Sequence, residues 1–207
     1  RCTLAGFHTQ SAPADTSHTA KAYKDLLQPG LHKIIGFATR SQGLITAAGN
    51  PLKLQSLADV VRTRARFVQR SHGTGTRVLL DDLLAQAHLH GQDLNNWPDE
   101  EPSHSALAES IASGRCDVGL GIESTALARG LGFVHLVEEQ FHLVCLKSAL
   151  DTPATQALRH FLQDAAWMQV LHTLPGYRAQ NGGEIQPLNK RLPWWTFKRT
   201  KKAQTTT

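Results

Sequence analysis

Short apolar runs alternate with segments of helical spacing along most of the chain. The strand-like runs are residues 34–38, 43–47, 65–68, 116–122, 133–137 and 141–146. Apolar residues recur at helical spacing in residues 19–27, 54–61, 79–87, 107–112 and 154–168. This alternation predicts an α/β fold with mostly parallel sheets and right-handed crossovers.

The signals at helix ends support this order. Thr152 is expected to cap the longest helix, with Pro153 in its first turn, and Pro175-Gly176 follows its end. Ser103 is placed to cap the helix of residues 107–112, and Gly114 suits the residue after it. The sequence shows no internal repeat.

Charge, cysteine content and hydropathy argue against several classes of protein. The net charge is +5, but residues 198–202 carry four of the positive charges, so the body is near neutral and does not indicate nucleic-acid binding. Three cysteines lie far apart without CxxC spacing, which favours a reducing compartment and a cytoplasmic protein. No run of about 18 apolar residues occurs, so no membrane insertion is expected. The start does not resemble a signal peptide, and we expect the chain to belong to a larger gene product.

The segment with the clearest chemistry lies between the strand-like run 65–68 and a helix. It consists of Gly73, Thr74, Gly75, Thr76 and Arg77. A helix start presents free N–H groups and a positive dipole end, and glycines allow a ligand to approach the backbone, which favours a compact anion. The Lys of a nucleotide-binding P-loop and the GxGxxG pattern are both missing. The alternative is that the glycines only make a turn and that Thr74 or Thr76 caps the helix.

Other residues give weaker signals. His88 and His90 stand two apart, so they do not share a helix face, and no metal site is expected. No catalytic set can be assembled from spacing, and Asp81-Asp82 is expected to serve the dipole of its own helix. We expect Glu138 and Glu139 to be solvated. The pair Trp194-Trp195 is expected to be a packing anchor rather than a ligand platform.

With these residues in place, a family resemblance is visible from about residue 4 to residue 183. It is carried by residues 40–44, 49–51, 66–70, 73–77, 103–108, 111–122 and 174–177. Their order is similar to the periplasmic-binding-protein-like domain of molybdate-responsive regulators, which also occurs fused to molybdopterin-biosynthesis proteins.

The resemblance implies a type II periplasmic-binding-protein-like fold of two lobes with parallel-rich sheets. Residues 41–139 would form the second lobe, and residues 1–40 with 140–190 the first. The family has a further strand and helix before Leu4, so the first lobe is expected to be incomplete, with the apolar residues 34–37 as one exposed face. Residues 191–207 are expected to be a disordered basic tail.

The same resemblance implies a function. The chain would be the ligand-binding sensor domain of a larger regulator, closing over a small oxyanion such as molybdate or tungstate. Thr74, Gly75 and Thr76, after Gly73, would bind the anion with Arg77 in support, and Ser103 and His104 would face the same cleft. No cofactor and no catalysis are expected, and the partner is a fused DNA-binding or biosynthetic domain. The alternatives are a domain of a molybdopterin-biosynthesis enzyme and a transport-type anion-binding protein.

Overall fold

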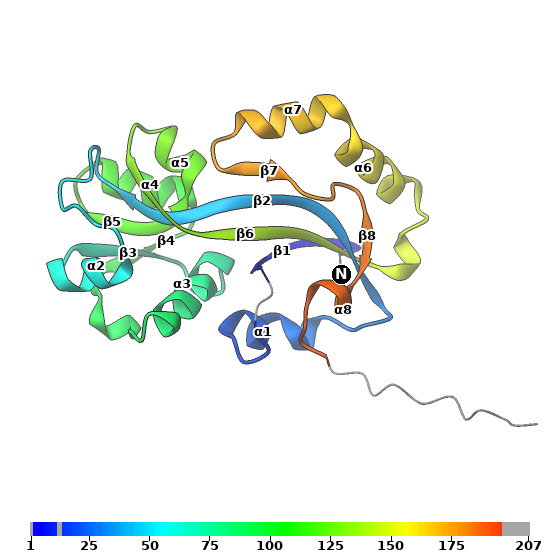
Figure 1. The fold of residues 1–207 in the computed structure, drawn as a ribbon, viewed down its shortest axis with the longest axis horizontal. Helices are drawn as coiled ribbons and strands as arrows, with labels where there is room; N and C mark the ends of the chain where they lie inside the picture. Colours follow the sequence, from blue (N-terminus) through cyan, green and yellow to red (C-terminus); the bar gives the residue numbers. More distant parts are fainter. Residues whose placement is uncertain (1, 12–13, 196–207) are drawn as a thin grey trace, which may run out of the picture.

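Two long antiparallel strands run side by side through the length of the molecule (Figure 1). They are β2 (His32–Thr46) and β6 (Gly132–Leu146), and we call the pair the central ribbon. The computed structural model describes residues 2–11 and 14–195. The register pairs His32 with Leu146 at one end of the ribbon and Thr46 with Gly132 at the other. Each strand therefore contributes to both ends of the molecule.

The remaining strands attach to the two ends of the ribbon in the order β1-β6-β2-β5-β3-β4. At one end β1 (Leu4–Gln10) pairs with β6, and β7 (Tyr177–Ala179) and β8 (Ile185–Pro187) pair with β2. The other end holds β5 (Val118–Ile122), β3 (Arg66–Arg70) and β4 (Asn95–Glu101). Among the described strands, parallel pairing is confined to β3 with β4 and β3 with β5. The sheet is thus mixed, and the expectation of parallel-rich sheets is wrong, because every strand that pairs with the central ribbon does so antiparallel.

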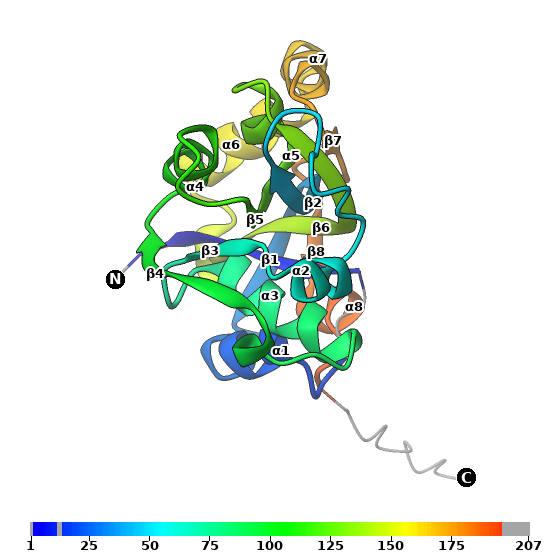
Figure 2. The same cartoon turned by 90° about the vertical axis from the view of Figure 1, so that its left-hand side faces the viewer.

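Helices cover both sides of this sheet (Figure 2). They are α1 (His18–Tyr23), α2 (Leu57–Thr63), α3 (Gly75–Gln86), α4 (His104–Ala112), α5 (Glu123–Leu127), α6 (Pro153–Gln163), α7 (Ala165–Thr173) and α8 (Leu188–Arg191). Short 3₁₀ turns occupy Lys24–Leu26, Gly91–Asp93 and Lys147–Ala149. Among the residues described, no helix has both the length and the apolar character that a membrane span requires.

The single long helix expected after Thr152 is in fact two helices. Asp164 separates α6 from α7 with extended backbone angles, and its carboxylate accepts the N–H groups of Ala166 and Trp167. An aspartate that caps a helix in this way competes with the helical path through its own position. The break turns α7 back towards β7 (Figure 1).

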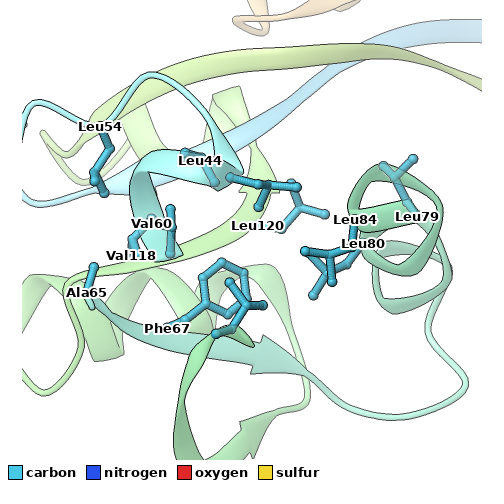
Figure 3. Close-up of a cluster of buried hydrophobic side chains, with 12 residues drawn as sticks. Leu44, Leu54, Val60, Ala65, Phe67, Leu79, Leu80, Leu84, Val118 and Leu120 are labelled. Carbon is cyan, nitrogen blue, oxygen red and sulfur yellow. The ribbon is translucent and has the colours of Figure 1, made fainter. Parts of the chain in front are cut away.

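Buried apolar side chains form separate clusters at the two ends of the ribbon. Between residues 44 and 137, one cluster packs α2 and α3 against the sheet (Figure 3) and a second packs α4 and α5. Phe67 lies fully buried in the first of these clusters and Leu107 in the second. Two further clusters draw their buried members from residues 7–35 and 144–194. We keep the names second lobe for residues 41–139 and first lobe for residues 1–40 and 140–190, and these boundaries remain a prediction.

The first lobe buries two segments that were expected to be exposed. Ile34 and Ile35 are fully buried, because β2 is an inner strand covered by Trp194 on one face and Leu162 on the other. Residues 191–195 are not part of a disordered tail, since α8 extends to Arg191 and Trp194 is buried beside Trp195. The expectation of a packing anchor is confirmed, and the rest of the expected tail, residues 196–207, lies outside the described residues.

Replacing Trp194 with alanine tests this anchor. The Trp194→Ala change should lower the free energy of unfolding by about 3–5 kcal/mol, because it leaves a large cavity among buried side chains. The matched control is Phe161→Ala at a position that is 54% exposed, which should lower it by only about 1 kcal/mol, because the main loss is the ring contact with Trp167. Denaturant unfolding measures both. Equal midpoints for the two variants would contradict the anchoring role.

Candidate functional site

The glycine-rich segment forms the start of α3. Thr74 is its N-cap: the Thr74 hydroxyl accepts the Arg77 N–H at 3.4 Å and donates to the Ser71 carbonyl at 2.8 Å. Gly73 has a φ of +80°, a left-handed conformation that favours glycine. The turn is therefore built by Gly73 and Thr74, and the N–H groups of Gly75 and Thr76, in the first turn of α3, have no partner within the helix.

A second helix begins beside the first. Ser103 is the N-cap of α4, and its hydroxyl accepts the Ala106 N–H at 3.0 Å. His104 is the first residue of α4, and its Nε2 lies 3.4 Å from Oγ1 of Thr76. The structure thus brings the two predicted segments together through Thr76 and His104, while the hydroxyls of Thr74 and Ser103 are used as caps.

Arg77 is held by carboxylates of its own lobe. Its Nη1 lies 3.4 Å from Oε1 of Glu100 and its Nε lies 3.9 Å from Oδ1 of Asp81. The Arg77 side chain is mostly buried. These carboxylates hold the Arg77 side chain beside the start of α3.

The strongest polar cluster was not predicted from the sequence. Glu139 is only 2% exposed, so the expectation that it is solvated is wrong. Its Oε2 accepts hydrogen bonds of 2.6 Å from Arg40 Nε and from Gln42 Nε2, and its Oε1 lies 2.9 Å from His8 Nδ1. We call His8, Arg40, Gln42 and Glu139 the hinge cluster, because Arg40 and Glu139 are paired in the middle of the central ribbon.

The hinge cluster keeps Glu139 ionised. Burial by itself would raise the pKa of the Glu139 carboxyl, but the hydrogen bond and charge of His8, the charge of Arg40 and the hydrogen bond from Gln42 outweigh it. The pKa is held at about 2, below the ordinary value of 4.5. The cluster thus contains a buried carboxylate that stays charged across the neutral pH range.

His8 connects the hinge cluster to the start of α3. A Cβ atom added at Gly75 would lie 2.8 Å from Nδ1 and Cε1 of His8 and 3.3 Å from the Tyr23 hydroxyl. Gly75 is therefore needed for the close approach of the first lobe, not for an unusual backbone angle. The contacts run without a break from His104 through Thr76 and Gly75 to His8.

The surroundings of this contact chain are positively charged. Burial and the charges of Arg70 and Arg40 lower the pKa of His104 to about 3, so its imidazole is neutral. Burial, then the charge of Arg40, lowers the pKa of Arg70. Arg70 donates to the backbone carbonyls of Glu101 and Pro102, each at 3.0 Å, and forms no ion pair with another described residue. Its charge is therefore not neutralised by a carboxylate.

A second contact joins the lobes at α1 and α3. The buried carboxylate of Asp82 accepts the N–H of His18 at 2.6 Å, the N–H of Thr19 at 3.1 Å and the Thr19 hydroxyl at 2.6 Å. Asp82 was expected to serve the dipole of its own helix, but it caps the start of α1 across the lobes. We call this contact the Asp82 clamp.

No group of three or more His, Cys, Asp or Glu side chains in the described part of the chain is arranged to hold a metal ion.

Residues 1–163 match a family described as PBP superfamily domain. The chain is 28% identical over 185 residues to the uncharacterized protein YvgK of Bacillus subtilis, covering 89% of this chain and 59% of that protein. It is 26% identical over 109 residues to an uncharacterized protein encoded upstream of a 2Fe-2S ferredoxin gene in Clostridium pasteurianum, covering 52% of this chain and 96% of that one.

Solved structures show the same fold at low identity. L-phospholactate-bound PEB3 has a TM-score of 0.57 at 18% identity, over 84% of this chain and 79% of that one; the Campylobacter jejuni Peb3 structure scores 0.56. A Clostridium difficile protein described as the substrate binding domain of a putative molybdenum ABC transporter has a TM-score of 0.53 at 13% identity, over 86% of this chain and 77% of that one. A histidine kinase sensor domain has a TM-score of 0.56 at 11% identity, over 87% and 72%.

Neutralising Glu139 should destabilise the protein in a pH-dependent way. Glu139→Gln removes one member of a buried charge pair, and we expect a loss of roughly 3–5 kcal/mol in the free energy of unfolding near pH 7. Because the folded-state pKa is depressed, the carboxylate stabilises the fold above about pH 4.5 and loses that effect as the pH falls towards about 2. The difference in the free energy of unfolding between wild type and variant, measured by urea unfolding, should therefore shrink as the pH falls from about 4.5 to about 2. Glu139 is not a buried, stabilising carboxylate if this difference stays constant with pH. The same conclusion follows if the difference is no larger than that of the exposed Glu109→Gln control.

Weakening the Asp82 clamp should loosen α1. Asp82→Asn leaves an acceptor for one N–H group but turns an NH₂ group towards the other donors, so α1 should separate from α3 more often. Hydrogen–deuterium exchange should show faster exchange at residues 18–23 with little change in β3 and β5. The control is Asp81→Asn, which lies next to the clamp. Unchanged protection of α1 in Asp82→Asn would argue against the clamp.

Proposed function

Because the chain belongs to the PBP superfamily, we propose that it is a ligand-binding sensor domain that takes a compact oxyanion where its two lobes meet. The anion would lie at the starts of α3 and α4. Its direct ligands would be the N–H groups of Gly75, Thr76 and His104 and the hydroxyl of Thr76. Gly73, Thr74 and Ser103 would shape the two turns, and Arg77 would support the first.

One observation carries this proposal: the starts of α3 and α4 meet at the Thr76–His104 contact of 3.4 Å. Two helix starts that converge on one point offer several N–H donors and two positive dipole ends, which is an arrangement suited to an anion. His8 of the first lobe packs against Gly75 at the same point, so a ligand there would contact both lobes.

The charges around this point favour a small anion. Glu139 neutralises Arg40 within the hinge cluster, whereas Arg70 keeps an uncompensated charge and His104 is neutral. A site with one free cation and many neutral donors attracts an anion without a fully buried ion pair. Molybdate and tungstate remain our first candidates, with other tetrahedral oxyanions as alternatives.

The fold neighbours give coarse support. They include a phospholactate complex, the binding domain of a putative molybdenum transporter and a histidine kinase sensor domain, which agree with anion binding and with sensing in proteins of this fold. The chain spans 59% of the length of YvgK. A fused DNA-binding or biosynthetic domain, a cytoplasmic location and the absence of catalysis are therefore proposals, and a transport-type binding protein or a domain of a molybdopterin-biosynthesis enzyme remain alternatives.

Calorimetric titration with molybdate, tungstate, sulfate and phosphate tests the site. Thr76→Val keeps the shape of the side chain but removes the hydroxyl, and the loss of one hydrogen bond to a charged ligand should weaken binding about ten- to a hundred-fold. Gly75→Ala should weaken binding too, because the added Cβ pushes His8 away. The control is Thr173→Val on α7, an exposed threonine whose hydroxyl donates to the Val170 carbonyl of its own helix.

Thr74→Ala is a poor test, since losing the cap of α3 would cost about 1 kcal/mol of stability without any ligand. If none of the four anions binds, or if Thr76→Val binds as tightly as Thr173→Val, the glycine segment is only a turn between β3 and α3.

A further inference from the structure

The central ribbon carries different chemistry on its two faces. Arg40 is paired with Glu139 in the sheet register, and Ser41 is paired with Glu138 one position further on. Because successive side chains of a strand point to opposite faces, the first pair enters the hinge cluster and the second faces away from it. The proposed oxyanion site lies on the side of Arg40 and Glu139, so Ser41 and Glu138 belong to the opposite side.

That opposite side opens into a cavity of about 480 Å³ that both lobes line. Ser41, Phe133, His135 and Glu138 come from the ribbon, Glu123 comes from α5 of the second lobe, and Gly176 and Arg178 come from the first lobe. Small-molecule sites usually measure about 300–1,000 Å³. The cavity is thus large enough for a small organic molecule.

The lobes touch closely beside this cavity. The Ser41 N–H donates to the Gly176 carbonyl at 2.8 Å. A Cβ at Gly176 would lie 2.7 Å from Oε2 of Glu123 and 2.9 Å from Cβ of Ser41. The position of Glu123 in the cavity is therefore set by direct contact with the first lobe.

The cavity contains charges that the protein itself does not neutralise. Among the described residues, Glu123, Glu138 and Arg178 form no ion pair, although all three line the same space. Ser41 and His135 are joined by a contact of 2.7 Å between Oγ and Nδ1. Two carboxylates and one guanidinium in one cavity complement a ligand that has both a cationic and an anionic group, and Phe133 adds an apolar wall.

We propose that this cavity binds an α-amino acid with an apolar side chain. Its ammonium group would pair with Glu123 and Glu138, its carboxylate with Arg178, and its side chain would lie against Phe133. Since both lobes line the cavity, such a ligand would bridge them on the face of the ribbon opposite the oxyanion site. Its affinity and that of the oxyanion would then be coupled.

Titration calorimetry with three matched probes tests the proposal on the 207-residue chain. The probes are phenylalanine, phenethylamine without the carboxylate and 3-phenylpropionate without the ammonium group. Phenylalanine should bind, and each single-charge probe should bind at least about tenfold more weakly. Glu138→Gln and Arg178→Gln should each weaken phenylalanine binding about ten- to a hundred-fold, with circular dichroism confirming that these exposed changes leave the fold intact.

Two controls separate this cavity from the oxyanion site. Glu109→Gln changes an exposed glutamate elsewhere, and Thr76→Val changes the proposed oxyanion site; in buffer without oxyanion, where the coupling has no bound partner, both should leave phenylalanine binding unchanged. The proposal is overturned if phenylalanine gives no binding, if the single-charge probes bind equally well, or if Glu138→Gln and Arg178→Gln bind like wild type. Loss of phenylalanine binding in Thr76→Val would also overturn it, because the amino acid would then occupy the other face.

Discussion

A buried carboxylate in the middle of the central ribbon determines much of this structure. Glu139 is only 2% exposed, and a charge removed from water is costly unless hydrogen bonds and an opposite charge compensate it. Arg40 and Gln42 on β2 and His8 on β1 supply that compensation. The need to satisfy one carboxylate therefore fixes three side chains from two other strands. One of these, His8, then packs against the start of α3.

The contact between the lobes depends on this arrangement at several points. His8 meets Gly75 beside the two helix starts, and the Asp82 clamp holds α1 against α3 on the same side of the sheet (Figure 2). On the other face of the ribbon, Ser41 and Gly176 are joined by a backbone hydrogen bond. A ligand that prefers one relative position of the lobes can shift their equilibrium only by its difference in affinity between the two positions. Because the lobes contact each other on both faces of the ribbon, a ligand bound on either face can have different affinities for the two positions.

The sequence predicted the local parts of this site and missed the part assembled from distant residues. The turn at Gly73–Thr74 and the cap at Ser103 depend on neighbouring residues, so the pattern was sufficient. His8 and Glu139 are 131 positions apart and belong to no motif, so nothing in the spacing joins them. The alternation of side chains along β6 offered one signal that a glutamate would be buried. Glu138 and Glu139 are adjacent in a strand, so they point to opposite faces and only one of them can point inward. The antiparallel ribbon was missed because alternating helices and strands do not specify strand direction when two strands cross both lobes.

The most direct test of the account is the position of a bound anion. Crystals grown with tungstate should give one strong anomalous peak for tungsten between the starts of α3 and α4. That peak should lie within hydrogen-bond distance of the N–H groups of Gly75 and Thr76, with His8 on its first-lobe side. A peak on the opposite face of the ribbon, or none in the presence of saturating tungstate, would contradict the claim that the two helix starts form an oxyanion site.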